Sequence, residues 1–278
     1  MYGYLTITRP VNSIIAGLAG VLGSLIATGT LVPEAAVLVG IVAFVTAAGN
    51  VVNDYCDAGI DAVNRPERPI PAGTVSMRGA LIYAALLFAA GNLLALLTNP
   101  LCLAIALFNS ALLVLYAVRL KATPFLGNLA VAYLSASIFL FGGAFAGMDG
   151  LLATLPVAGV TFLAMTAREV LKDAEDIEGD RAGGARTLPM IVGVDRSVGI
   201  AFAFALAAAL LSMLPVFRWW GLPYLAAIGL LNAGVLYRSL AVRGCTTPAC
   251  IRRSGVTATL KKGMFLSLLI FTAAALLS

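Results

Sequence analysis

The 278-residue chain contains no histidine, and only 11% of its residues are charged. The absence of histidine excludes histidine metal ligands, serine–histidine triads and histidine general bases. Any bound metal is then expected to take oxygen ligands, which favours a hard cation. Soluble domains carry about 25% charged and roughly 45–50% apolar residues, whereas 61% of this chain is hydrophobic. The composition therefore predicts an integral membrane protein.

Cysteine is also scarce, with four residues whose spacings match no zinc-binding or thioredoxin-like pattern. Cys245 and Cys250 flank a four-residue stretch and are close enough in sequence to form a disulfide. We nevertheless expect unpaired thiols. No cleavable signal peptide is expected, because Met1–Pro10 runs directly into an apolar stretch without a convincing cleavage site.

Nine apolar stretches are long enough to cross a membrane as α-helices, which takes about 20 residues each. They predict an all-α, polytopic membrane bundle that forms a single domain over residues 1–278. The many small residues in these stretches suit the close approach of helices in lipid. The stretches cover residues 11–30, 33–53, 79–98, 100–120, 124–147, 151–172, 196–217, 219–241 and 259–277.

The distribution of basic residues predicts a cell-membrane protein with its N-terminus in the cytoplasm. In that orientation, 17 of the 18 lysines and arginines lie inside or at the inner span ends, and only Arg218 lies outside. The acidic residues follow the same division, with only Glu34 and Asp149 outside. Carboxylates concentrated beside a bilayer indicate a functional site, which we therefore expect on the cytoplasmic face.

Two aspartate motifs of identical spacing end the second and sixth predicted spans. On a continuous helix, the aspartates of a D-x-x-D-x-x-x-D pattern lie within an arc of about 60°. Three carboxylates on one face repel one another unless a cation lies between them. Mg²⁺ fits, and because it shares its coordination sphere with substrate phosphates, the pattern indicates a diphosphate substrate. The matched positions, 119 residues apart, are Asp54, Asp57 and Asp61 against Asp173, Asp176 and Asp180.

Arginines follow both motifs, at Arg65 and Arg68 and again at Arg181 and Arg186. Arginine suits bidentate contacts with phosphate. One acidic helix end is as often a solvated terminus as a site, but a matched pair on one membrane face, each with trailing arginines, favours the site.

Two weaker elements accompany the motifs. In Tyr116–Lys121, the aromatic and basic side chains fit interfacial anchors and a functional role equally well. In the segment that enters the first span, Arg9 is typical of an orientation anchor, whereas Asn12 is polar at the start of a span and requires a partner.

Together these elements resemble the UbiA superfamily of intramembrane prenyltransferases over nearly the whole chain. The resemblance lies in N-D-x-x-D-x-x-x-D at Asn53–Asp61, the R-P-x-R-P that follows it, Y-x-x-x-x-K at Tyr116–Lys121 and the second motif at Asp173–Asp180. Within the superfamily, the segments around Arg9 and over 64–73 and 168–180 are most similar to archaeal geranylgeranylglyceryl phosphate geranylgeranyltransferases.

The resemblance implies Mg²⁺-dependent transfer of a geranylgeranyl group from geranylgeranyl diphosphate to the free hydroxyl of geranylgeranylglyceryl phosphate. This reaction forms the second ether bond of archaeal membrane lipids. Its partners are a polyprenyl diphosphate and a lipid-phosphate acceptor, with no nucleic acid. A prenyltransferase with an aromatic quinone precursor as acceptor remains an alternative, and a transporter remains a more distant one. A CDP-alcohol phosphotransferase is disfavoured, because its paired aspartates form one uninterrupted pattern.

The resemblance also implies roles for single residues, with Asp54 left out of each set. A motif carboxylate is expected to take the acceptor proton, since no histidine is present. Catalytic roles fall to Asp57, Asp61, Asp176, Asp180 and Lys121. Substrate contacts fall to Arg9, Asn12, Asn53, Arg65, Arg68, Tyr116 and Lys172. Metal ligation falls to Asn53, Asp57, Asp61, Asp173, Asp176 and Asp180.

Overall fold

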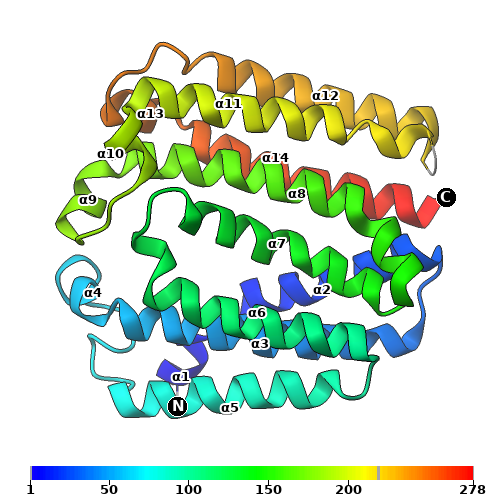
Figure 1. The fold of residues 1–278 in the computed structure, drawn as a ribbon, viewed down its shortest axis with the longest axis horizontal. Coiled ribbons are helices and arrows are strands. Elements are labelled where there is room, and N and C mark those ends of the chain that lie inside the picture. The colour runs from blue at the N-terminus through cyan, green and yellow to red at the C-terminus, as the bar shows by residue number, and fades with distance from the viewer. Residues whose placement is uncertain (1, 218–219, 278) are drawn as a thin grey trace. The chain divides into compact units, whose positions relative to one another are not determined.

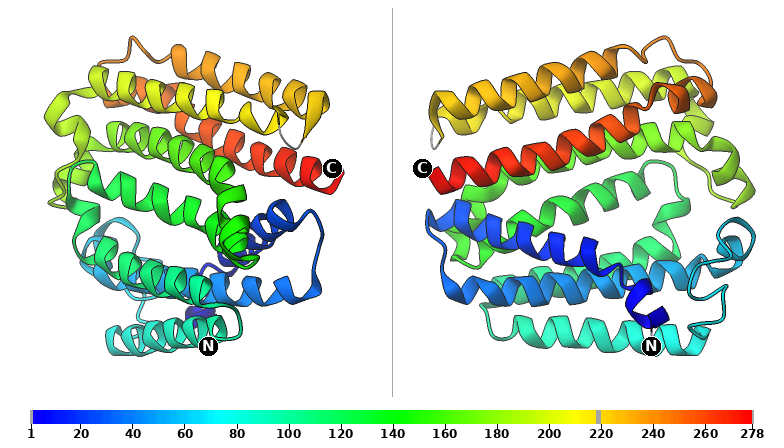
Figure 2. Two further views of the ribbon diagram at one scale, coloured as in Figure 1. Left: turned by 45° about the vertical axis from the view of Figure 1, so that its right-hand side comes forward. Right: turned by 180° about the vertical axis from the view of Figure 1, so that it is seen from behind.

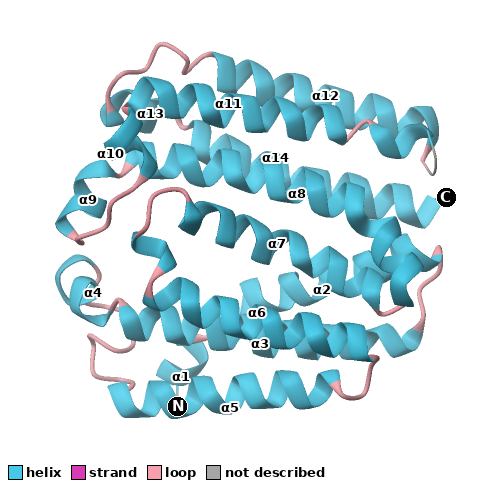
Figure 3. Ribbon diagram, viewed as in Figure 1, coloured by secondary structure: helices cyan, strands magenta, loops and turns pink. Residues whose placement is uncertain are grey.

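The computed structural model describes residues 2–217 and 220–277, and these residues form helices and loops only (Figures 1 and 3). The all-α prediction is confirmed. Eight of the described helices are long and apolar enough to cross a membrane, each at a predicted span. A ninth helix, α12 (Gly221–Leu240), occupies predicted span 219–241 but is not among these eight. The chain is therefore a multi-pass membrane protein. Arg218, the predicted outside residue, lies outside the described residues.

The described residues divide into two compact units. The first unit comprises residues 2–119 with 137–154, and the second comprises residues 120–136 with 155–217 and 220–277. Helices α7 (Leu126–Ala144) and α8 (Gly147–Glu175) each contribute residues to both units.

In the first unit, α3 lies centrally and packs against α2, α5 and α6. The two hydrophobic cores of the first unit bury aliphatic side chains of α3 such as Leu38, Ile41 and Val51. The short helix α1 meets α2 at a bend (Figure 2). Besides parts of α7 and α8, the unit contains α1 (Tyr2–Ile7), α2 (Pro10–Thr28), a 3-10 turn (Pro33–Ala35), α3 (Ala36–Cys56), α4 (Ala58–Asn64), α5 (Met77–Ala95) and α6 (Pro100–Val118).

Glycine allows α2 and α7 to approach closely within the first unit. A Cβ atom on Gly142 would lie 2.0 Å from the carbonyl oxygen of Gly20, and a Cβ on Gly23 would lie 2.6 Å from that of Phe139. No larger residue fits either position without moving a backbone. This crossing is the close packing that small residues give to membrane helices.

The second unit is built around a core that includes Val170, Leu171, Val198 and Ile251. In it, α12 packs against α11 and α14. Besides parts of α7 and α8, the unit contains a 3-10 turn (Leu120–Ala122), α9 (Ile177–Ala182), α10 (Leu188–Val192), α11 (Val194–Leu211), a second 3-10 turn (Leu214–Phe217), α12, α13 (Pro248–Ser254) and α14 (Val256–Leu277).

A disulfide joins Cys245 to Cys250 in the connection between α12 and α14, with their Cα atoms 5.5 Å apart. The prediction of unpaired thiols was wrong for this pair. The fold brings the two Cα atoms to ordinary disulfide separation, which their spacing in the sequence does not reveal.

Both aspartate motifs interrupt their helices at the central aspartate. Asp57 separates α3 from α4 with φ −90° and ψ 0°, and Asp176 separates α8 from α9 with φ −119° and ψ 28°. The continuous helix that the prediction assumed is therefore interrupted in both motifs. Each motif is a helix end followed by a short helix, and in the first motif its first and last aspartates remain close enough to share one arginine nitrogen.

Candidate functional site

The first motif is organised by ion pairs with arginine. Arg68 comes from the loop after α4, and its Nη1 lies 2.6 Å from Asp61 Oδ2 and 3.1 Å from Asp54 Oδ1. Arg9, at the junction of α1 and α2, places Nη2 2.6 Å from the same Asp54 oxygen. Both aspartates are buried, at 4% exposure for Asp54 and 5% for Asp61. Their charges are therefore compensated within the unit.

Asp57 has different surroundings, and it lies at the junction of the two helices. Asn53, one turn earlier on α3, donates a hydrogen bond from Nδ2 to Asp57 Oδ2 at 3.0 Å. Backbone hydrogen bonds of helical spacing continue on both sides of the break, from Asp57 N to Asn53 O and from Asp61 N to Asp57 O. Asn53 and Asp57 thus present neighbouring amide and carboxylate oxygens, which are ligands that Mg²⁺ accepts.

The second motif is supported from α7 and from its own helix. Asn128 donates from Nδ2 to Asp173 Oδ2 at 2.8 Å. Glu169, one turn earlier on α8, pairs with Arg168 and with Lys172, whose Nζ lies 3.3 Å from Glu169 Oε2. Lys172, a predicted substrate contact, is therefore held on the same helix as the motif and remains 56% exposed.

Asp176 and Asp180 approach each other around Gly179. A Cβ atom on Gly179 would lie 2.6 Å from Asp176 Oδ1, so a side chain at this position would displace that carboxylate. Asp180 has a buried Oδ2 without a hydrogen-bond partner among the described residues. Burial raises the pKa of Asp180 to about 6, the charge of Asp176 adds to the rise and Lys172 opposes it. A bound cation would satisfy this oxygen and relieve the repulsion.

The remaining predicted substrate contacts lie in the first unit. In the first unit, Asn12 is exposed on α2, Arg65 is exposed at the end of α4 and Tyr116 is half-buried near the end of α6. Lys121, which was predicted to be catalytic, is half-buried in the 3-10 turn of the second unit.

Sequence reasoning missed two supporting residues. Asn128 was not singled out, although it is a lone amide near the start of an apolar span, which indicates a polar partner. Asp54 was left out of the site sets, yet it pairs with two arginines, Arg9 and Arg68.

The types of side chain in the two motifs suit Mg²⁺, but the described carboxylates do not gather around one point. Over residues 2–217 and 220–277, no three acidic or cysteine side chains are close enough together to hold a metal ion. In the first motif, Asp54 and Asp61 are ion-paired with arginines instead of facing a shared metal position. The oxygen-only donor set, the Asn53–Asp57 pair and the unsatisfied Asp180 oxygen are nevertheless suited to a hard cation.

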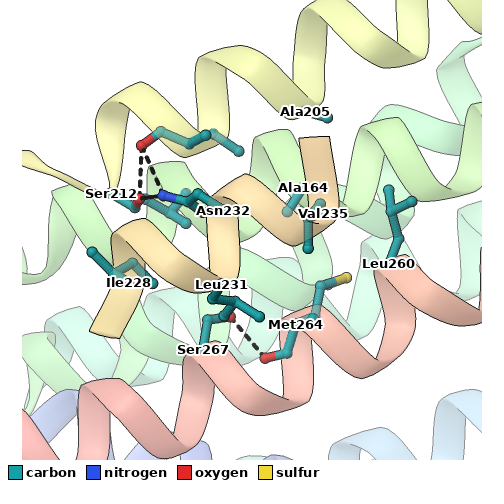
Figure 4. A pocket seen from close by; sticks show the side chains of 14 residues that line it. Ala164, Ala205, Ser212, Ile228, Leu231, Asn232, Val235, Leu260, Met264 and Ser267 are labelled. Carbon is teal, nitrogen blue, oxygen red and sulfur yellow. Dashed lines mark hydrogen bonds between the residues drawn. The ribbon is translucent and has the colours of Figure 1, made fainter. Parts of the chain in front are cut away.

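The second unit also contains a pocket that none of these carboxylates lines (Figure 4). Its lining comes from α8, α11, α12 and α14, and is mostly aliphatic. Asn232 is its most polar residue, and its Nδ2 donates to Ser212 Oγ at 2.9 Å. No predicted site residue and no charged side chain lines this pocket. It lacks the groups that prenyl diphosphate chemistry needs.

Comparison with known proteins identifies the family. The model of the UbiA prenyltransferase family matches residues 7–269 of the chain. The chain belongs to this family. The UbiA-like fold and the prenyltransferase class expected from the sequence are thereby confirmed, and the transporter alternative is not retained.

Relatives and solved structures narrow the position of the chain within the UbiA family. The digeranylgeranylglyceryl phosphate synthase of Methanoculleus marisnigri is 56% identical over 274 residues, which cover 99% of this chain and 98% of the relative. A solved structure from work on digeranylgeranylglyceryl phosphate synthase in membranes has a TM-score of 0.87 and 32% identity, covering 100% of this chain and 99% of its own. A UbiA homologue from Archaeoglobus fulgidus bound to GPP and Mg²⁺ has the same fold, with a TM-score of 0.67, 16% identity and coverage of 99% and 100%.

Proposed function

We propose that the chain transfers a geranylgeranyl group from geranylgeranyl diphosphate to the free hydroxyl of geranylgeranylglyceryl phosphate, forming an ether and releasing diphosphate. The observation that carries the proposal is the 56% identity to a digeranylgeranylglyceryl phosphate synthase across 99% of this chain. The two aspartate motifs, each with neighbouring cations, supply the chemistry for an anionic leaving group.

On the donor side, we propose that Asn53, Asp57, Asp61, Asp173, Asp176 and Asp180 are ligands of Mg²⁺. Bound there, Mg²⁺ would neutralise the negative charge that builds on the departing diphosphate. Arg65, Arg68, Lys121 and Lys172 contact the phosphate oxygens directly and add to this stabilisation. Tyr116 binds near the same group. The Asn53–Asp57 hydrogen bond holds one carboxylate ready for this role.

On the acceptor side, Arg9 binds the phosphate of geranylgeranylglyceryl phosphate and Asn12 orients its glycerol part. A motif carboxylate accepts the proton that the hydroxyl loses when its oxygen attacks the allylic carbon. The apolar helices keep water from the developing allylic cation. Because both isoprenoid chains are lipids, they enter from the bilayer and need no aqueous tunnel.

We further propose that these groups act on the cytoplasmic side, with the N-terminus inside. The division of basic residues, 17 against one, supports this orientation. The family match over 7–269 supports the proposal that residues 1–278 form one prenyltransferase domain.

The acceptor is tested with detergent-purified protein, Mg²⁺ and labelled geranylgeranyl diphosphate. Geranylgeranylglyceryl phosphate and 4-hydroxybenzoate are offered in parallel as acceptors. We expect a labelled ether from the lipid phosphate and no product from the aromatic acid. Product from 4-hydroxybenzoate alone would contradict the proposed acceptor and move the chain to quinone biosynthesis.

A further inference from the structure

Asp54 is a buried carboxylate that joins two arginines from different parts of the first unit. Its Oδ1 accepts Arg9 Nη2 at 2.6 Å and Arg68 Nη1 at 3.1 Å. The same Arg68 nitrogen also reaches Asp61 Oδ2 at 2.6 Å. Arg9, Arg68, Asp54 and Asp61 therefore form one connected network, in which Asp54 is the group that the arginines share.

The backbone at Arg9 is held from the same face of α3. Arg9 has φ 48° and ψ 61°, a left-handed conformation that is unfavourable for a residue with a Cβ atom. Asn50, one helical turn before Asp54, donates from Nδ2 to the carbonyl oxygen of Thr8 at 3.1 Å. Ser13 Oγ donates to the same carbonyl at 2.9 Å. Thus α3 fixes both the main chain before Arg9 and the end of its side chain.

Asp54 and Asp57 differ in the hydrogen-bond partners of their carboxylate oxygens. Asp57 is bonded to an amide on its own helix, whereas Asp54 is 4% exposed and has two guanidinium groups on a single oxygen. Those charged hydrogen bonds are strong and directional. They hold that oxygen of Asp54 against both arginines, which suits Asp54 to fixing their positions.

We infer that Asp54 is a positioning residue, which holds Arg9 and Arg68 at a fixed separation so that one receives the acceptor phosphate and the other the donor diphosphate. The inference builds on the proposed function, since it assigns the two arginines to two anionic substrates. Arg9 retains 35% side-chain exposure and Arg68 retains 19%, so each guanidinium keeps donors for a further anion. A guanidinium presents five such donors.

The test is a double-mutant cycle with Asp54→Asn, Arg9→Gln and the double variant, using steady-state kinetics for both substrates. Asp54→Asn is expected to raise KM for the lipid-phosphate acceptor and for geranylgeranyl diphosphate by about 10-fold each, with kcat reduced less than about 3-fold. In the Arg9→Gln background, the effect of Asp54→Asn on the acceptor KM disappears, because its partner is already gone. Its effect on the donor KM remains.

Glu67→Gln is the matched control, since it removes an exposed carboxylate beside Arg68 and should leave both KM values unchanged. If Asp54→Asn does not fold, Arg9→Gln is compared with Arg9→Lys, which keeps the charge but lacks the planar fork. A raised acceptor KM in Arg9→Lys supports the inference, and an unchanged KM in both Arg9 variants overturns it.

Two results with folded Asp54→Asn would overturn the inference. One is equal effects of Asp54→Asn in the wild-type and Arg9→Gln backgrounds. The other is an increased Mg²⁺ requirement with unchanged KM for both substrates, which would make Asp54 a metal ligand. If wild type turns over only an aromatic acceptor, the proposed function fails, while the donor KM measured in Asp54→Asn and Arg68→Gln still decides whether Asp54 positions Arg68.

Discussion

Replacing Asp57 or Asp176 with asparagine is expected to reduce prenyl transfer by about 100-fold or more. Each residue lies at the point where its motif interrupts the helix. Asparagine preserves the size of the side chain and one oxygen but removes the negative charge that a divalent cation requires. The measurement is turnover of labelled geranylgeranyl diphosphate at saturating acceptor.

Asp195→Asn serves as the control, because it removes an exposed carboxylate from the first turn of α11 and should keep wild-type turnover. Thermal unfolding in detergent establishes that each variant is folded. Near wild-type turnover in either Asp57→Asn or Asp176→Asn would show that the roles assigned to these carboxylates are wrong.

Removal of divalent cations is expected to abolish activity, and added Mg²⁺ is expected to restore it. The physical reason is the charge of the motifs. In the second motif the carboxylates of Asp176 and Asp180 repel each other. One buried oxygen of Asp180 has no hydrogen-bond partner within residues 2–217 and 220–277. Without a cation, a diphosphate would add further negative charge to this region.

A binding measurement separates metal binding from chemistry. Mg²⁺ together with inorganic pyrophosphate should raise the Tm of the wild-type protein, since a ligand that binds only the folded state stabilises it. Asp176→Asn should show a smaller rise. Full activity in excess chelator, or equal rises in both proteins, would contradict the Mg²⁺ assignment.

Most of the fold could be predicted from hydropathy because a membrane span needs about 20 apolar residues in succession. Predicted span 100–120, for example, is α6, Pro100–Val118. The helix breaks at Asp57 and Asp176 could not be predicted in this way. Periodicity assumes a continuous helix, and neither break is marked by proline.

The partners of the motif residues were harder to predict than the motifs themselves. Arg9 and Asp54 are 45 residues apart in the sequence, as are Asn128 and Asp173. Spacing within one helix identifies residues on a shared face, but contacts between elements depend on how the elements pack. For this reason the motifs were recognised from the sequence. The pairing of Asp54 with arginines and the hydrogen bond from Asn128 were not.

The central claim is that the acceptor hydroxyl oxygen attacks the allylic carbon of geranylgeranyl diphosphate. The most direct measurement uses geranylgeranylglyceryl phosphate with oxygen-18 in its free hydroxyl, followed by mass spectrometry of both products. We predict that the ether retains the label and that the released diphosphate carries none. A labelled phosphate ester of the acceptor in place of a labelled ether would place the attack at phosphorus and contradict the assignment of the chain's reaction as prenyl transfer.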